Sequence, residues 1–182
     1  MDRLKKAALL TRLIKRLREE ESWCGETHVQ KATFFLQRLM QVPLGFDFIL
    51  YKHGPFSFDL RDELTALRAD DLVRLEPQGP YGPRIAATER SKYIEELYSK
   101  TLAEYGGRID FVAKSLGRKG VADLERLATA LYITELAGSG ASVNERANQM
   151  TALKPHIPPE IARDAIEQVD RIIREAQRYL PA

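Results

Sequence analysis

The chain has 182 residues, of which 44% are hydrophobic and 30% charged, and its net charge is +2. This length allows one large domain or two small ones, and the small net charge does not by itself indicate a nucleic-acid-binding protein. No run of about 18 apolar residues is present, so we expect no transmembrane span. Basic residues interrupt any signal-peptide pattern near the N-terminus. With a single cysteine, Cys24, the sequence predicts a cytoplasmic protein without an internal disulfide.

The positive charge is concentrated at the N-terminus. Residues 1–20 contain seven Lys or Arg against three Asp or Glu, and apolar periodicity predicts a helix over 4–19. Lys5, Arg12 and Arg16 fall opposite its apolar side, as an exposed basic stripe. Such a stripe can contact DNA phosphates, although a charge-rich helix face is more often simply solvated.

A second helix and a strand follow. The pattern predicts a helix from Thr27, as its N-cap, to about Met40. Aromatic and β-branched residues then predict a strand over 46–52. Gly54-Pro55 is expected to stop this strand, since proline lacks an amide hydrogen.

The next elements complete a recognisable order. Ser57 is a good N-cap for a third helix, which ends at Asp70-Asp71. Residues 72–76 and 84–88 are expected to form a β-hairpin around a turn rich in Pro and Gly. Helix, helix, strand, helix and hairpin is the order of a winged helix-turn-helix.

The remainder of the chain is predicted to be helical. We expect a helix from Ser91 to about Tyr105, a break at Gly106-Gly107 and a short helix over 109–116. Ser142 and Glu145 have the spacing of a capping box. The predicted fold class is therefore α+β and mostly helical. A winged-helix domain spans residues 1–92 and a helical extension spans 93–182, either packed as one body with it or forming a separate subdomain.

Several motifs resemble a bacterial winged-helix family. They are Lys31, Phe34-Phe35, the run Tyr51-Lys-His-Gly-Pro-Phe-Ser57, the run Leu124-Glu-Arg-Leu-Ala-Thr129 and the run Leu153-Lys-Pro-His156. The chain is similar to the YwgA-like proteins over most of its length and, around the Gly-Pro turn, to the Panacea (SocA-like) antitoxins. The resemblance implies a non-catalytic regulator or an antitoxin-like module that binds a toxin.

One hypothesis is a DNA-binding regulator that inserts the third helix into a major groove. The base-contacting candidates are Ser57, Arg61, Thr65 and Arg68. Phosphate and wing contacts would come from Lys5, Arg12, Arg16, Arg74, Tyr81 and Arg84. Against this hypothesis, the third helix and its end carry five acidic residues and only two arginines.

The alternative is an adaptor or antitoxin that binds a protein and does not contact DNA. Phe56 and Phe58 would be its anchors if the fold leaves them exposed, because aromatic side chains dominate interface hot spots. Asp62 and Glu63 would supply the acidic part of that surface. Either partner allows a homo-oligomer.

Catalysis is the weakest class. His53 has no obvious partner in the sequence, and a catalytic histidine needs one. Cys24 and His28 have i, i+4 spacing, but the two further ligands of a metal site are missing, so a buried thiol is the better interpretation. We predict no catalytic residue, metal or cofactor.

Overall fold

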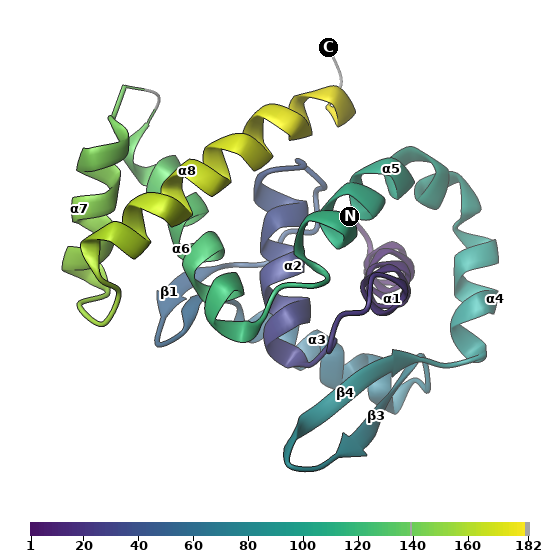
Figure 1. Ribbon diagram of the computed structural model, residues 1–182. Helices are drawn as coiled ribbons and strands as arrows, with labels where there is room; N and C mark the ends of the chain where they lie inside the picture. The colour runs from purple at the N-terminus through teal and green to yellow at the C-terminus, as the bar shows by residue number, and fades with distance from the viewer. Residues whose placement is uncertain (139, 181–182) are drawn as a thin grey trace.

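The chain folds into an α+β structure dominated by helices (Figure 1). This computed structural model describes residues 1–138 and 140–180, and of Tyr81 only the backbone. The helices are α1 (Arg3–Glu19), α2 (Glu26–Arg38), α3 (Phe58–Ala69), α4 (Arg90–Leu97), α5 (Ser99–Leu116), α6 (Val121–Ala137), α7 (Val143–Leu153), α8 (Pro159–Ala176) and the 3-10 turn η1 (Gln177–Tyr179). The strands are β1 (Ile49–Tyr51), β2 (Gly54–Phe56), β3 (Val73–Gln78) and β4 (Tyr81–Ala87).

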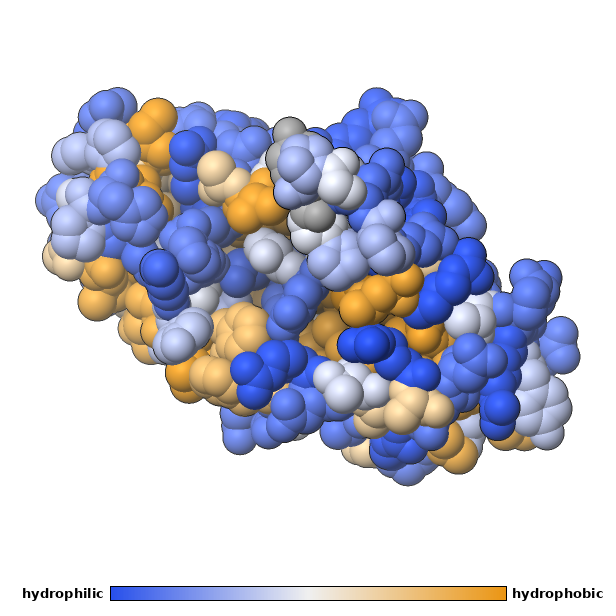
Figure 2. Space-filling view, turned by 90° about the horizontal axis from the view of Figure 1, so that it is seen from below, coloured by the Kyte–Doolittle hydropathy of each residue, from blue (hydrophilic) through white to orange (hydrophobic). Residues whose placement is uncertain are grey.

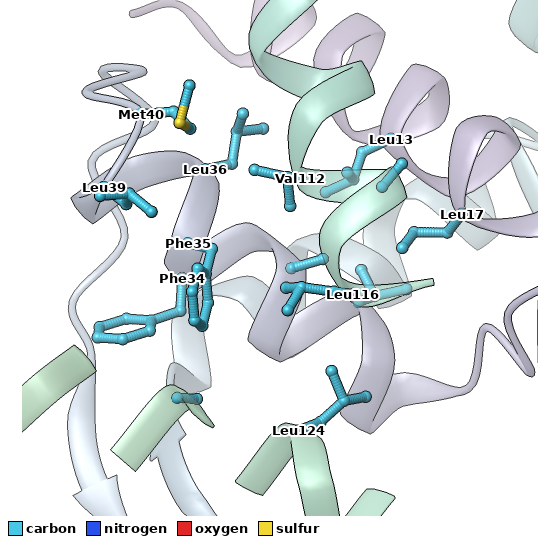
Figure 3. Close-up of a cluster of buried hydrophobic side chains, with 14 of the residues drawn as sticks. Leu13, Leu17, Phe34, Phe35, Leu36, Leu39, Met40, Val112, Leu116 and Leu124 are labelled. Carbon is cyan, nitrogen blue, oxygen red and sulfur yellow. The ribbon is translucent and has the colours of Figure 1, made fainter. Parts of the chain in front are cut away.

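Helix α2 lies at the centre of the molecule, with α1, α5 and α6 around it (Figure 1). Phe34 and Phe35 of α2 are about 1% exposed and meet edge to face. Figure 3 shows the surrounding cluster, in which Leu13 comes from α1, Leu116 from α5 and Leu124 from α6. Apolar burial around this helix therefore joins elements that are far apart in the sequence.

The hydrophobic core is continuous across residue 92. It runs from Ala7 in α1 to Ala176 in α8, because α5 packs on α1 and α6 packs on α2. At the C-terminal end, Arg146 of α7 pairs with Asp170 of α8 at 2.7 Å and donates to the Thr134 hydroxyl of α6. This bidentate pair fixes the packing of the last three helices.

Two antiparallel hairpins complete the fold. In the first, Ile49 pairs with Phe56 and Tyr51 with Gly54. In the second, β3 and β4 pair from Val73 and Ala87 to Gln78 and Tyr81. The predicted second hairpin is confirmed, although its strands extend further into the Pro/Gly segment than expected.

Several local predictions are confirmed by the hydrogen bonds. The Ser57 hydroxyl accepts from the amide of Leu60 and caps α3. Ser142 and Glu145 form the reciprocal bonds of a capping box at α7. Cys24 is a buried free thiol, and burial raises its pKa to about 12.

The prediction of one long strand over 46–52 is wrong. Only 49–51 are in β1, and Gly54-Pro55 belongs to β2 instead of ending the strand. The reason is that the backbone of Phe46 is paired with the Gln37 side chain, whose amide donates to the carbonyl and accepts from the N–H. A side chain of α2 thus takes the place of a neighbouring strand.

Two helix boundaries also differ from the prediction. Helix α2 begins at Glu26 with Gly25 as its N-cap, so Thr27 lies inside the helix. The break in the second half occurs at Tyr98 and not at Gly106-Gly107, which lie within α5. Each glycine lowers the stability of a helix by about 1 kcal/mol relative to alanine, whereas burial of each large apolar side chain of α5 stabilises the fold by roughly 1.5–3 kcal/mol. Burial therefore keeps α5 continuous through the two glycines.

Candidate functional site

An aromatic cluster lies exposed where the first hairpin meets α3. We call Ile49, Tyr51, Phe56 and Phe58 the aromatic patch. The ring centroids of Phe56 and Phe58 are 5.1 Å apart, and the Tyr51 ring lies 5.7 Å from that of Phe58. Tyr51 is 53% exposed, Ile49 48% and Phe58 41%. The register of the hairpin places Ile49, Tyr51 and Phe56 on one face, because paired residues and residues two apart share a face.

Two polar side chains of α2 hold this segment from beneath. The Gln30 amide donates to the carbonyl of Ser57 and accepts from its N–H, at 2.9 and 3.0 Å. The ammonium of Lys31, which is 2% exposed, donates to the Pro55 carbonyl at 2.9 Å. Burial lowers the pKa of Lys31 to about 8. These bonds satisfy buried backbone groups and fix the backbone beneath the patch.

The first hairpin is held on its other side by the C-terminal half of the chain. Lys154 donates to the carbonyls of Tyr51 and Lys52 at 2.5 and 2.6 Å. The Glu125 carboxylate lies 3.4 Å from His53 Nδ1 and 3.2 Å from His156 Nε2. Close approach of α6 requires glycine at Gly54, since a Cβ there would lie 3.0 Å from Thr129 Oγ1. The hairpin is therefore anchored from both sides.

The acidic residues of α3 and of its C-cap, Asp70, lie in two different surroundings. Glu63 and Asp70 pair with Arg3 of α1, at 3.2 and 2.6 Å, so Glu63 is turned away from the patch. Asp59 is exposed, and Asp62 has 75% of its side chain exposed although Arg61 lies 3.6 Å away. Of the two acids predicted for a protein interface, Asp62 is the one beside the aromatic patch.

The basic stripe of α1 is not the free surface that we expected. Arg12 lies 3.8 Å from Glu95 of α4, and Arg16 pairs with Asp110 of α5 at 2.6 Å. Lys5 pairs with Asp2 at its own N-cap. Helices α4 and α5 pack against α1, and their acids neutralise the side that the periodicity had placed in solvent.

Other predicted DNA contacts have structural roles. Ser57 is fully buried and occupied with capping α3, so it cannot touch a base in this conformation. Arg84 donates to the carbonyls of Trp23 and Ser22, which leaves it half-buried. Arg74 pairs with Glu76 at 2.8 Å. The Tyr81 side chain lies outside the described part of the chain.

The remaining predicted contacts of α3 do lie together. Arg61, Thr65 and Arg68 follow one face of the helix and border a groove between α3 and the second hairpin. Arg61 also lies over the Phe58 ring, 5.0 Å from its centroid. Figure 2 views the molecule from the side on which the second hairpin lies, and shows apolar surface in separate patches among hydrophilic side chains.

Residues 1–138 and 140–180 contain no cluster of three or more His, Cys, Asp or Glu placed to hold a metal ion. Within the same ranges, no helix combines the length and the apolar character needed to cross a bilayer.

Sequence reasoning missed the outer members of the site. The sequence predicts Ile49 and Tyr51 within a strand over 46–52 and does not predict the turn at Lys52-His53 that exposes them. The alternation of Ile49 and Tyr51 opposite Phe56 was the available signal. Lys31, Glu125 and Lys154 belong to the motifs quoted for the resemblance, but their convergence on one hairpin could not be inferred from spacing.

Comparison with models of known protein families finds no match to this chain. Comparison with curated proteins finds none either.

Proposed function

We propose that this chain is a non-catalytic regulatory or antitoxin-like module that binds a protein through the aromatic patch. In this proposal α1 to β4 constitute a winged helix, with α3 as its third helix and the β3–β4 hairpin as the wing. The observation that carries the proposal is the mutual contact of three rings, two on the anchored first hairpin and one at the start of α3, of which Tyr51 and Phe58 are exposed.

Rigid exposed aromatics are well suited to binding. A ring loses little conformational entropy when a partner covers it, and aromatic anchors contribute most to protein interfaces. The buried bonds from Gln30 and Lys31 fix the backbone beneath the patch before any partner arrives. A binding surface held in this way costs less ordering free energy than a flexible one.

The charges beside the patch specify the chemistry of the partner. Phe58 and Asp62 are four residues apart on α3 and so share a face, and Asp59 is exposed next to Phe58. We infer a partner segment that presents an apolar side chain to the rings and a Lys or Arg to these carboxylates. Regulators and antitoxins act by such contacts and need no reacting group.

The test is affinity purification of the wild-type chain from its native cells, followed by titration of the captured protein. Replacing Tyr51 and Phe58 together by Ala should weaken binding by at least about 30-fold, since the loss of even one hot-spot aromatic costs about 2 kcal/mol or more. Tyr93→Ala is the matched control, because Tyr93 is 71% exposed on α4. Circular dichroism must show an unchanged fold for each variant.

A second candidate function is DNA binding, favoured by one observation. Thr65 and Arg68 of α3 and Arg74 of β3 line a shallow groove together, and Arg68 forms no ion pair with another described residue. A gel-shift series in increasing salt, with wild type and Arg68→Glu, separates the two candidates. Salt-sensitive binding that Arg68→Glu abolishes and the Tyr51/Phe58 variant retains would replace the protein-partner proposal with DNA binding.

A further inference from the structure

The two edges of the first hairpin differ in their hydrogen bonding. Leu50 and Pro55 lie opposite each other, and because proline has no N–H this pair cannot exchange two backbone hydrogen bonds. The ladder bonds of the hairpin therefore join the residue pairs on either side of it. It follows that the N–H and C=O of Leu50 point away from β2, and that the C=O of Pro55 points away from β1.

The edge formed by β2 is occupied by side chains of α2. The outward carbonyl of Pro55 accepts from the Lys31 ammonium at 2.9 Å. The N–H and C=O of Ser57, two residues further on, both bond to the Gln30 amide. Unpaired backbone groups at a sheet edge are a template for pairing with another strand, and here α2 has already satisfied them.

The edge formed by β1 has no such cover. No hydrogen bond from a described residue reaches the outward N–H and C=O of Leu50, or those of Phe48 two positions earlier. Among the described elements, α6 packs against β2, whereas β1 packs extensively against β2 alone. Figure 1 shows the turn of this hairpin projecting from the body of the molecule beyond α6. The edge of β1 is therefore available to a further strand.

Three side chains beside this edge specify which strand would fit. Ile49 and Tyr51 share the outer face of β1 and are 48% and 53% exposed. Neighbours on one face of paired strands lie about 4.5–5.5 Å apart, so two apolar side chains two positions apart would cover both. Asp47, two residues before Ile49, is exposed and forms no ion pair with another described residue. It favours a Lys or Arg at that end of the added strand.

The composition and the anchoring of β1 both favour such pairing. Protected edge strands usually carry a charged residue, a proline or a bulge, whereas β1 is Ile-Leu-Tyr. The hairpin is held by Lys31 on one side and Lys154 on the other, so an added strand meets a backbone that is already ordered. Because the edge is short, contacts with the aromatic patch must supply much of the affinity.

We propose that the partner binds by strand addition, with an extended segment pairing along the free edge of β1. This inference rests on the proposed function and specifies how the same aromatic patch is recognised. Apolar side chains of the segment cover Ile49 and Tyr51, and a Lys or Arg lies opposite Asp47. The segment therefore alternates with a period of two, whereas a bound helix would present apolar residues at spacings of three and four.

The test selects binders from a phage-displayed library of random dodecapeptides on the immobilised full-length chain. We expect enriched peptides to show two apolar residues at alternate positions and a basic residue two positions from one of them. Asp47→Lys should weaken their binding by about three- to tenfold. Glu96→Lys on exposed α4 is the matched control for the change of charge and should have no effect. Enriched peptides with helical spacing, or an equal effect of the two substitutions, would overturn strand addition.

Backbone methylation of an enriched peptide tests the main-chain contact directly. Alternate amides of a strand point to the same edge, so N-methylation at alternate residues is made in both registers. One register should weaken binding at least tenfold, and the other should leave it nearly unchanged. Equal effects of the two registers would overturn strand addition. In the unmodified protein, saturating peptide should slow the hydrogen exchange of the Leu50 amide at least tenfold, and an unchanged rate would contradict the pairing.

The same peptides separate a failure of this inference from a failure of the proposed function. Replacing Tyr51 and Phe58 by Ala should abolish their binding. Peptides that need these rings but tolerate methylation in both registers would retain the aromatic patch and reject strand addition. Peptides that bind the alanine variant as well as the wild type would reject the patch itself. A library that yields no enriched peptide would overturn strand addition and leave the affinity purification to test the patch.

Discussion

Replacing Lys31 by Met tests the energetic role of the buried ammonium beneath the first hairpin. Lys31 is 2% exposed, and burial lowers its pKa from 10.5 to about 8. A lowered pKa means that the folded state binds this proton less tightly than the unfolded state. Below pH 8 both states are protonated and the folded state carries the full cost of the buried charge.

The size of the effect follows from the pKa difference. Each pKa unit corresponds to 1.36 kcal/mol, so the charged Lys31 destabilises the fold by about 3 kcal/mol at pH 7. Between pH 8 and pH 10.5 the folded state loses the proton first, and its stability rises with pH. From pH 7 to pH 10, the wild type should gain roughly 2–3 kcal/mol of unfolding free energy that Lys31→Met does not gain.

The assay is urea unfolding at pH 7, 8, 9 and 10, monitored by circular dichroism. The wild type is compared with Lys31→Met and with Lys100→Met, which replaces an exposed lysine of α5. The difference in unfolding free energy between wild type and Lys31→Met should shift by roughly 2–3 kcal/mol over this range. The difference for Lys100→Met should stay nearly constant. A Lys31→Met difference that also stays constant would refute the buried charged lysine as a source of instability.

Two further substitutions test how the first hairpin is held. Gly54→Ala should lower the unfolding free energy by about 1–3 kcal/mol, because φ is +82° and the new Cβ would lie 3.0 Å from Thr129 Oγ1. The control is Gly82→Ala, because a Cβ added at Gly82 would meet no other atom within 4 Å, and its thermal unfolding should change little. An equal loss of stability in the two variants would contradict the steric explanation for Gly54. Gln30→Leu should cost roughly 1–3 kcal/mol in urea unfolding, since it leaves the buried N–H of Ser57 unpaired, whereas the Ser57 carbonyl still accepts from the amide of Arg61. Its control is Gln149→Leu on the exposed side of α7, and a comparable loss there would show that the Ser57 bonds are not responsible.

Local chemistry explains why several elements could be predicted. Ser57 caps α3 with its own hydroxyl, and the capping box of Ser142 and Glu145 closes within four residues. The Pro/Gly turn between β3 and β4 likewise joins strands that are adjacent in the chain. Interactions between residues that are close in the chain require particular residue types at fixed spacings, and these can be recognised in a sequence.

Only part of the candidate site could be predicted, because its other members are placed by contacts between residues far apart in the chain. Phe58 and Asp62 were predicted as interface residues and lie together on exposed α3. Glu63 was predicted with them, but it pairs with Arg3, which is 60 residues away in the chain. The periodicity of α3 does not distinguish Asp62 from Glu63, because the difference arises from the ion pair between Glu63 and Arg3 of α1.

The sequence by itself determined the helical α+β character, the capped start of α3 and the second hairpin. Each depends on backbone preferences and on hydrogen bonds between residues close in the chain. Only the tertiary structure decided that Glu95 and Asp110 neutralise the basic stripe of α1, and that Gln37 replaces a strand beside Phe46. It also placed Lys31 and Gln30 of α2 along one edge of the first hairpin. Long-range packing determines these contacts. Burial stabilises any pair of complementary surfaces, whatever their separation in the chain, and so produces no periodic pattern in the sequence.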